Sequence, residues 1–307
     1  MPNLEPNVPP PRRVTPLEVP AAARDGLRFP LTRDQLVTRV REALEEDGAF
    51  NDITTIATVR SDRRARAALV ARQGGTVAGI PFALETFRTL DPKVSMRVDT
   101  EDGKRAMRGE TVVYITGHAR AMLSAERVAL NFMMRLSGIA TLTSRYVDAV
   151  RGTGVRILDT RKTTPGWRSL EKYAVRAGGG SNHRMDLSSS VLIKDNHLAA
   201  VDGQVEVAVR RARQLAPPGA KIEIECITVD QVAAAAAAGA NIILLDNMPL
   251  EVMRECVKVT ARRAELEASG GVTLDNVRAI AGTGVDMISV GALTHSAAAL
   301  NLALDFE

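Results

Sequence analysis

Cationic side chains gather in one stretch of this chain, from residue 157 to residue 197, with glycines and short apolar runs between them. These residues are Arg161, Lys162, Arg168, Lys172, Arg176, His183, Arg184, Lys194 and His197. Guanidinium and ammonium groups bind carboxylates and phosphates, and several of them together suit a ligand with more than one negative charge. The stretch therefore predicts a pocket for a multiply anionic small molecule.

Short apolar runs alternate with helical patterns after Gly154, which indicates a parallel β/α architecture. The runs cover residues 155–158, 191–193, 222–224, 242–245, 266–268 and 287–290, and the helical patterns cover residues 203–215, 229–238, 250–263 and 273–281. A closed barrel would need at least one more strand than these six. An open doubly wound sheet is the structural alternative.

Polar residues and glycines stand at or just after the ends of these predicted strands. They are Arg161, Lys162, Lys194, Glu225, Asp246, Glu267, Ser269 and Gly291. The carboxyl ends of barrel strands carry the chemistry of such folds, so we expect these residues to share one site.

Two glycine-containing turns follow the last two predicted strands, Ser269-Gly270-Gly271 and Val290-Gly291-Ala292. Backbone N–H groups of such turns commonly hold a phosphate in barrels, because glycine lets the main chain approach closely. A single turn of this kind also occurs for purely geometric reasons. Two in consecutive positions favour a phosphate site.

Three carboxylates, on Glu225, Asp246 and Glu267, are expected on the same edge. Carboxylate oxygens suit Mg²⁺ that is held partly through substrate phosphates. The alternative is a structural network that neutralises nearby cations. Glu223 shares the strand face of Glu225, so spacing alone does not choose between these two.

Lys194 also admits a different chemistry, because a desolvated lysine at the end of a barrel strand can form a Schiff base. The surrounding cations favour anion binding over one neutral amine, so this aldolase-like interpretation is the weaker one. His183 and His197 are candidates for acid–base chemistry, but a histidine beside Arg184 is equally suited to donating a hydrogen bond to a carboxylate.

The first half of the chain has a different pattern. Residues 1–30 hold eight of the fourteen prolines and predict an extended arm, and a helix is predicted to begin at Thr32, with Gln35 completing its cap. Short strands at 67–71, 76–78, 94–98 and 111–116, with a helix at 82–90, indicate a small α/β sandwich. Helical periodicity then runs from Ser124 to about Val150, with a predicted break near Ser137-Gly138.

Composition narrows the class of protein. With 307 residues and 45% apolar content the chain is large enough for one large domain and a smaller one. A net charge of +4 and only 3% aromatic residues make nucleic acid a weak candidate partner. Two cysteines, Cys226 and Cys256, show no metal-ligand spacing and favour a reducing cytoplasm. We expect neither a membrane span nor a secretory signal.

Several motifs together give the chain a resemblance to the quinolinate phosphoribosyltransferases. The motifs are SAERVALNFMMRLSGIAT at 124–141, DTRKTTPG at 159–166, LEKYAVRAGGGSNHR at 170–184, LIKDNH at 192–197, EIE at 223–225, LLDNM at 244–248, LEASGG at 266–271 and VGALTHS at 290–296. They cover most of the chain after residue 120, and EDGAFNDITT at 46–55 is similar less tightly.

The resemblance implies a fold and a reaction. The fold is an N-terminal open-faced α/β sandwich over 31–138, a seven-stranded α/β barrel over 139–292, and a C-terminal segment, 293–307, that returns to the sandwich. The reaction transfers phosphoribose from phosphoribosyl pyrophosphate to quinolinate with Mg²⁺, and gives nicotinate mononucleotide, pyrophosphate and CO₂. This is a step of de novo NAD biosynthesis.

The same resemblance implies roles for residues of this sequence. Arg161, His183 and Arg184 would bind the quinolinate carboxylates, with Thr160 positioning the ring and Arg127 reaching in from a neighbouring subunit of a homodimer or larger homo-oligomer. Lys162 and Lys194 would contact quinolinate and the phosphates. Glu225 and Asp246 would bind the ribose hydroxyls and Mg²⁺. The 5′-phosphate would be bound by two turns, one of Ser269, Gly270 and Gly271 and the other of Val290, Gly291 and Ala292.

The sequence departs from the family pattern at Trp167, Ala177, Asp186 and Ile227. Asp186 is the departure that matters most, because its carboxylate could compete for Arg184. Two other functions stay open: a related phosphoribosyltransferase that acts on another aromatic acid, and a non-catalytic metabolite-binding barrel.

Overall fold

The structure is a computed structural model that describes residues 26–307. The proline-rich arm predicted for residues 1–30 lies almost wholly outside the described residues. Within them, no helix is both long enough and apolar enough to cross a membrane.

The first helix begins where the sequence predicts. Helix α1 (Arg33–Glu46) has Thr32 as its N-cap, and its capping box is complete. The Thr32 hydroxyl accepts from the Gln35 N–H at 3.3 Å, and the Gln35 side chain accepts from the Thr32 N–H at 2.9 Å. Two short helices follow, η1 (Ala49–Asn51) and α2 (Ile53–Thr58).

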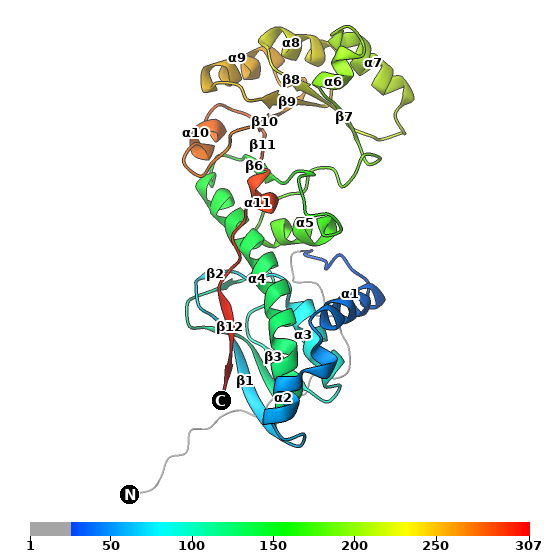
Figure 1. Cartoon of the computed structure of the whole chain (residues 1–307). Helices are drawn as coiled ribbons and strands as arrows, with labels where there is room; N and C mark the ends of the chain where they lie inside the picture. Colours follow the sequence, from blue (N-terminus) through cyan, green and yellow to red (C-terminus); the bar gives the residue numbers. More distant parts are fainter. Residues whose placement is uncertain (1–25) are drawn as a thin grey trace, which may run out of the picture.

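A four-stranded sheet forms the first domain, with the order β12-β1-β5-β3. Its strands are β1 (Arg64–Ala71), β3 (Ser95–Val98), β5 (Thr111–His118) and β12 (Leu302–Phe306). The small ribbon of β2 (Gly75–Thr76) and β4 (Arg105–Ala106) lies beside it. Helices α3 (Ile80–Leu90) and α4 (Ala119–Ala149) cover the sheet, and Phe87 of α3 belongs to the same buried cluster as Leu69 and Ile115 of the strands. The C-terminal strand β12 pairs antiparallel with β1, so the chain ends in its first domain (Figure 1).

Helix α4 is continuous over 31 residues, and the predicted break near Ser137-Gly138 is wrong. Both residues serve tertiary packing instead. The Ser137 hydroxyl accepts from the Ala78 N–H at 2.9 Å and donates to the Ala78 carbonyl at 3.1 Å. A Cβ on Gly138 would clash with the backbone oxygen of Ala298. The two small residues let the β2–α3 turn and the C-terminal segment cross the helix closely.

The second domain holds a sheet of six parallel strands in the order β6-β11-β10-β9-β8-β7. These are β6 (Arg156–Leu158), β7 (Val191–Ile193), β8 (Ile222–Cys226), β9 (Ile242–Asp246), β10 (Glu265–Ser269) and β11 (Met287–Ser289). The helices of this domain are α5 (Arg168–Ala177), α6 (Asp195–Ala199), α7 (Val205–Leu215), α8 (Val229–Ala238), α9 (Leu250–Thr260), α10 (Val277–Ala281) and α11 (Ala292–His295) (Figure 1).

The strand order is that of a barrel. The first strand of the domain, β6, pairs with the last, β11, and the others follow in sequence order. A doubly wound sheet reverses its order midway, and none of the described strands does so. Beyond β6 a single parallel bridge joins Leu158 to Ser181. This bridge takes the place of the seventh strand, and the segment after it leads on to β7.

Candidate active site

The register of the parallel sheet arranges its inward-facing side chains in two layers. Glu225 lies opposite Leu244, and Asp246 lies opposite Ser269, at the carboxyl ends of β8, β9 and β10. Glu223 and Glu267 precede Glu225 and Ser269 by two residues, so they face the same interior one layer deeper. The sequence could not separate Glu223 from Glu225, and the structure does so by depth.

The outer layer brings together a lysine and two carboxylates. Lys194 directly follows β7, and its ammonium group pairs with the Glu225 carboxylate. The side chain of Lys194 is 46% exposed and that of Glu225 is 12% exposed, so a ligand in the solvent can reach the pair from the lysine side. The Asp246 carboxylate is half-buried and accepts from the Asn247 side chain at 2.9 Å.

The turn after β10 has the backbone conformation that its glycines predict. Gly270 has φ of +92° and Gly271 has φ of +58°, both in the left-handed region. A Cβ on Gly270 would also collide with the Asn247 side chain. The turn therefore packs tightly against the residue that follows Asp246.

The turn after β11 lies beside Lys162. A Cβ on Gly291 would lie 3.2 Å from Lys162 Cδ, and the Lys162 carbonyl accepts from the Thr294 hydroxyl at 2.7 Å. The Lys162 N–H donates to the Thr160 hydroxyl at 3.0 Å. The structure thus brings the DTRK segment and the last glycine turn together, as the shared-site prediction requires.

Two guanidinium groups meet on the other side of the site. Arg161 and Arg184 are both half-buried, and within residues 26–307 the buried Nε of each has no hydrogen-bond partner. Burial, followed by the charge of Arg161, lowers the pKa of Arg184 below its usual range. Arg184 Nη1 donates to the Ser190 carbonyl at 3.0 Å. Because the charge of Arg161 disfavours the charged form of Arg184, an anion bound beside both guanidiniums would offset this repulsion.

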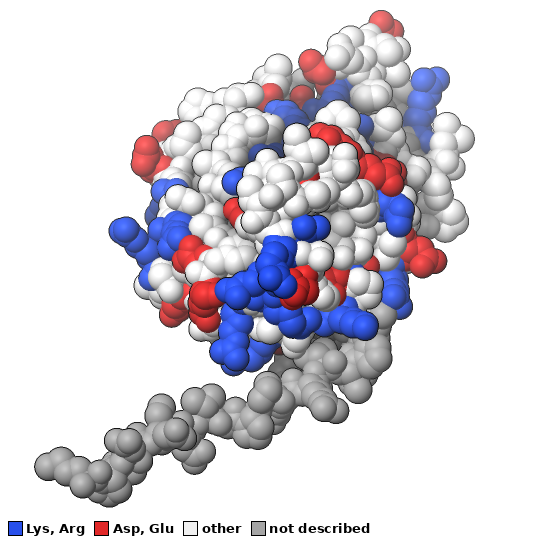
Figure 2. All heavy atoms as spheres, turned by 60° about the horizontal axis from the view of Figure 1, so that its bottom comes forward, with Lys and Arg blue, Asp and Glu red and all other residues white. Residues whose placement is uncertain are grey.

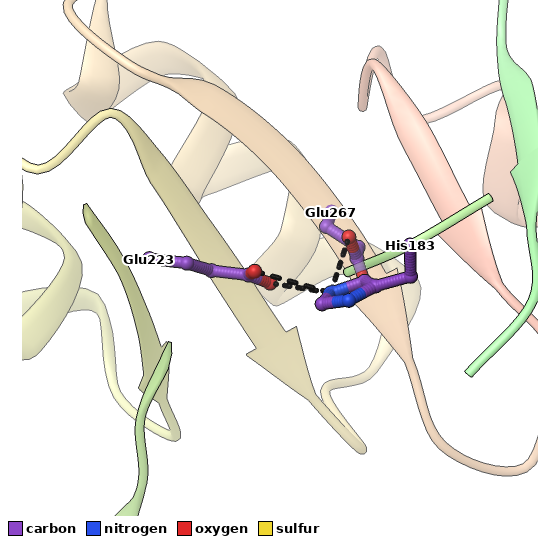
Figure 3. A group of neighbouring side chains, drawn as sticks. All are labelled: His183, Glu223 and Glu267. Carbon is purple, nitrogen blue, oxygen red and sulfur yellow. Dashed lines mark hydrogen bonds and ion pairs between the residues drawn. The ribbon is translucent and has the colours of Figure 1, made fainter. Parts of the chain in front are cut away.

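His183 points into the deeper layer. Its Nε2 lies 3.1 Å from a Glu223 oxygen and 3.7 Å from a Glu267 oxygen (Figure 3). Its Nδ1 accepts from the Arg184 backbone N–H at 2.7 Å. Burial lowers the pKa of His183, but the hydrogen bond and charge of Glu223 and the charge of Glu267 outweigh burial, so the net shift is upward.

Glu267 is the most perturbed carboxyl group of this layer. It is 1% exposed, and neither of its oxygens makes a hydrogen bond within the described part of the chain. Burial and then the charge of Glu223 raise its pKa to about 7. The expectation that Glu267 belongs with the metal-binding carboxylates of the rim is thus not met, because it lies below the rim.

The His183, Glu223 and Glu267 donor atoms lie within 4.8 Å of one another, a spacing that a metal ion could bridge. The hydrogen bond from the Arg184 N–H to Nδ1 argues against this. A histidine that binds a metal through Nε2 normally carries its proton on Nδ1. Here Nδ1 accepts, so the ring proton belongs on Nε2 and points at the carboxylates.

A pocket of about 340 Å³ adjoins this layer. His183 and Arg184 line it together with Glu223 and Glu267, and it extends to the strand starts at Arg156, Ile242 and Met287. The Lys194–Glu225 pair does not line this pocket. Of the residues that the sequence assigns to the base, His183 and Arg184 line this pocket, whereas Thr160 and Arg161 do not.

Arg127 lies apart from the pocket and from the rim. It projects from α4 with 61% of its side chain exposed, and its nearest carboxylate is that of Glu126 on the same helix, at 3.8 Å. Within one chain the described residues do not bring Arg127 to the pocket or the rim.

The cation-rich stretch is less uniform than predicted. Lys172 is 1% exposed and pairs with Asp159, Arg176 donates to the Arg28 carbonyl at 3.1 Å, and the His197 ring accepts from the Lys194 N–H at 3.0 Å. These three residues support the structure rather than face a ligand. Asp159 was missed, although its place directly after an apolar strand was a usable signal.

The departures from the family pattern leave the site intact. The Asp186 carboxylate accepts from Ser188 and Ser189 of its own turn, and no ion pair joins it to Arg184 within the described residues. Ile227 is 63% exposed, and Trp167 stacks on Phe132 with ring centroids 5.4 Å apart.

Comparison with known proteins agrees with this geometry. The model of the quinolinate phosphoribosyl transferase C-terminal domain matches residues 139–305, and that of the N-terminal domain matches residues 52–137. The chain is 45% identical over 274 residues to the nicotinate-nucleotide pyrophosphorylase [carboxylating] of Mycobacterium leprae, covering 87% of this chain and 95% of that one. The human protein of the same name is 39% identical, with 91% and 94% covered.

Among solved structures, NadC from Streptococcus pyogenes superposes with a TM-score of 0.85 at 39% identity, covering 90% of this chain and 99% of that chain. The similarity therefore extends through both domains. The chain belongs to the quinolinate phosphoribosyl transferase family.

Proposed function

We propose that this protein transfers the phosphoribosyl group of phosphoribosyl pyrophosphate to the ring nitrogen of quinolinate and releases pyrophosphate and CO₂. The observation that carries the proposal is the pair of half-buried guanidiniums, Arg161 and Arg184, beside a rim with Lys162, Lys194 and two carboxylates. A dicarboxylate fits the first region and a phosphorylated sugar the second.

On the base side, Arg161 and Arg184 receive the two quinolinate carboxylates, with His183 beside them and Thr160 fixing the adjoining loop. The planar guanidinium fork meets a carboxylate through two parallel hydrogen bonds. The unpartnered Nε groups of both arginines support this assignment. A single carboxylate would leave one of the two guanidiniums without a counter-ion.

On the sugar side, Lys162 and Lys194 contact the phosphates, and Glu225 and Asp246 contact the ribose hydroxyls. The backbone N–H groups of the turns at Ser269, Gly270 and Gly271 and at Gly291 and Ala292 hold the 5′-phosphate. The Val290 N–H, expected to belong to this set, donates instead to the Leu158 carbonyl at 2.9 Å. Lys194 now pairs with Glu225, and substrate phosphate would compete for its ammonium group.

Mg²⁺ fits the same rim. Glu225 and Asp246 lie on adjacent strands and face the same interior, and both supply the hard oxygen ligands that Mg²⁺ prefers. When bound, the ion would neutralise charge on the departing pyrophosphate. The two carboxylates themselves stabilise the positive charge that develops on the ribose as that bond breaks.

The final step needs placement more than a base. Once the ring nitrogen is bonded to ribose, its positive charge stabilises the electron pair left on the adjacent ring carbon as CO₂ departs. A proton from solvent then bonds to that carbon and gives nicotinate mononucleotide. Arg161 and Arg184 hold the ring with that carboxylate oriented, which is catalysis by positioning.

We further propose a homodimer, or a larger homo-oligomer, in which Arg127 of one subunit completes the base pocket of its partner. Its exposure on α4, away from the site of its own chain, supports this role. The two thiols, Cys226 and Cys256, are buried and free, which suits the reducing cytoplasm where we place the enzyme.

The test is an assay of purified protein by mass spectrometry with quinolinate, phosphoribosyl pyrophosphate and Mg²⁺. We expect nicotinate mononucleotide from quinolinate, none from nicotinate, and little product without Mg²⁺ or from the Lys194→Ala variant. Turnover of another aromatic acid instead would support the residues assigned to the phosphorylated sugar and contradict those assigned to quinolinate. Binding of both ligands without turnover would point to a non-catalytic barrel.

A further inference from the structure

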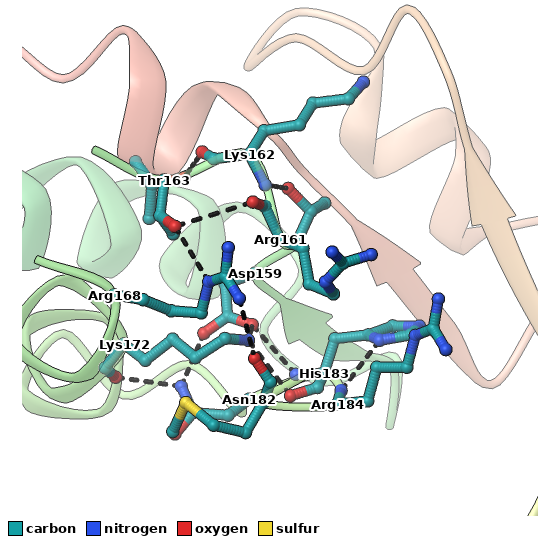
Figure 4. A network of polar contacts seen from close by, with 12 residues as sticks. Asp159, Arg161, Lys162, Thr163, Arg168, Lys172, Asn182, His183 and Arg184 are labelled. Atoms are coloured by element: carbon teal, nitrogen blue, oxygen red, sulfur yellow. Dashed lines mark hydrogen bonds and ion pairs between the residues drawn. The ribbon is translucent and has the colours of Figure 1, made fainter. Parts of the chain in front are cut away.

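A buried ion pair lies directly behind the base pocket. Asp159, at the end of β6, is 0% exposed, and Lys172, in the middle of α5, is 1% exposed. Their charged groups contact each other, and Figure 4 shows them between helix α5 and the segment that carries His183 and Arg184. Neither side chain reaches a ligand in the proposed function.

The pair satisfies both backbone polar groups of His183. Asp159 Oδ1 accepts from the His183 N–H at 2.9 Å, and Lys172 Nζ donates to the His183 carbonyl at 3.0 Å. Asn182 adds a third tether, since its side-chain amide donates to Asp159 Oδ2 at 2.5 Å and to the Lys172 carbonyl at 2.8 Å. Three side chains thus fix one peptide segment on both sides.

Stability alone does not account for this pair. Burial raises the pKa of Asp159 and lowers that of Lys172, and each charge opposes the shift of the other. Desolvation of two charges often cancels their attraction, and apolar residues of similar size frequently serve as well. What apolar residues cannot do is accept from the His183 N–H and donate to its carbonyl.

The segment needs such a restraint. Arg184 follows His183, and its guanidinium is within the electrostatic reach of Arg161, so like-charge repulsion acts on it before the dicarboxylate binds. The segment continues into the exposed turn at residues 185–189 and is joined to β6 by the single Ser181 bridge. On the other side of His183, the Met185 carbonyl accepts from Arg168 Nη1 at 3.3 Å.

We propose that Asp159 and Lys172 are positioning residues that hold His183 and Arg184 in place for the base, so that affinity for the dicarboxylate depends on them and affinity for the phosphorylated sugar does not. This inference rests on the proposed function. It concerns only the base side, because the rim residues Lys194, Glu225 and Asp246 make no contact with the pair within the described residues.

The experiment compares the double variant Asp159→Leu/Lys172→Met with the wild-type enzyme. Removing both charges together avoids an unpaired buried charge. We expect the KM for quinolinate to rise about tenfold or more, by analogy with other small misplacements of binding groups, and the KM for phosphoribosyl pyrophosphate to stay within about twofold. Direct titration of quinolinate by calorimetry should show the same loss.

Tyr173→Phe is the matched control. Tyr173 neighbours Lys172 on α5, is buried, and donates to Asp102 of the first domain at 2.6 Å instead of to the His183 segment. Its loss should leave the quinolinate KM near the wild-type value. An equal rise in this control would show that any disturbance of α5 weakens quinolinate binding, and would overturn the proposal.

Other outcomes are equally decisive. If the wild type does not bind or convert quinolinate, the proposed function fails and this inference with it. If the wild type is active and the double variant keeps its quinolinate KM, or if both KM values rise together, the inference alone fails. If the double variant does not fold, the Asn182→Ala variant provides the test. Asn182 is half-buried, and its replacement should raise the KM for quinolinate but not the KM for phosphoribosyl pyrophosphate. An unchanged KM for quinolinate would reject the proposal.

Discussion

At the scale of single residues, Arg184 is the side chain whose removal should weaken quinolinate binding most directly. It is half-buried, its pKa is lowered by burial and by Arg161, and its Nε lacks a partner in the described structure. We expect Arg184→Ala to reduce kcat/KM for quinolinate by about 2–5 kcal/mol, the range for truncating one partner of a buried charged pair.

Steady-state kinetics of Arg184→Ala and of Arg176→Ala would measure this. The buried Nε of Arg176, on α5, also lacks a partner in the described structure, but its Nη2 donates to the Arg28 carbonyl, so its variant should behave as wild type. Unchanged quinolinate kinetics in Arg184→Ala would remove that residue from the site.

Glu267 should make the stability of the protein depend on pH. Its pKa is raised from 4.5 to about 7, so between these values the folded state binds a proton that the unfolded state has lost. The free energy of unfolding therefore falls as the pH rises through this window, by an amount on the order of 3 kcal/mol. Below pH 4.5 the contribution is fully present.

Urea unfolding of wild type and Glu267→Gln between pH 5 and pH 8 would isolate this effect. The difference between the two curves should grow as the pH rises, in favour of the variant. Glu265→Gln, on the same strand but 40% exposed, is the control for removing a carboxylate from β10. A flat difference for Glu267→Gln would contradict the prediction.

Residue types and spacing predicted many of the residues of the candidate site but not how deeply each side chain is buried. The rim residues Lys194, Glu225 and Asp246 were predictable because each ends or directly follows an apolar strand. The roles of Lys172 and Glu267 were not, because a buried charge and a rim charge look alike in sequence. Only the strand register separates them.

At the scale of elements, Gly138 should be essential to how α4 packs. A Cβ at this position would clash with the Ala298 backbone, which cannot move as a flexible side chain would. We expect Gly138→Ala to lower the free energy of unfolding by about 1–3 kcal/mol, as overpacking does, despite the better helix propensity of alanine.

Thermal and urea unfolding would test this against Arg145→Ala, an exposed position on the same helix. The control should change stability little. A more stable Gly138→Ala protein would mean that the C-terminal segment does not cross the helix as closely as described.

The elements show why sequence patterns succeed or fail. The six barrel strands were predictable because each is a short apolar run between polar turns. The seventh position escaped notice because its residues, Ser181 to Arg184, are polar and are held by a bridge and by side chains. The break predicted in α4 was wrong for the converse reason, since Ser137 and Gly138 looked like helix breakers while serving tertiary contacts.

At the scale of the whole molecule, the distribution of surface charge bears on which ligands the protein binds. The end of the molecule formed by the first domain shows a group of basic side chains with acidic side chains within and around it (Figure 2), and the net charge of the chain is +4. Small anions at the barrel rim remain the expected ligands.

Assembly gives a further prediction through Arg127. If Arg127 acts in the partner's site, mixing the inactive variants Arg127→Ala and Lys194→Ala creates hybrid dimers with one complete site. Random exchange of subunits should then restore about a quarter of wild-type activity. No recovery after verified subunit exchange would show that Arg127 acts within its own chain.

The pairing of β12 with β1 has a consequence for how the molecule is made. During translation β1 leaves the ribosome before the second domain, whereas its neighbour, residues 302–306, appears only after that domain. Until then one edge of β1 is an open template for pairing with other chains. The first domain therefore completes its sheet only after the entire second domain has been synthesised, and nascent chains depend on protection of that edge.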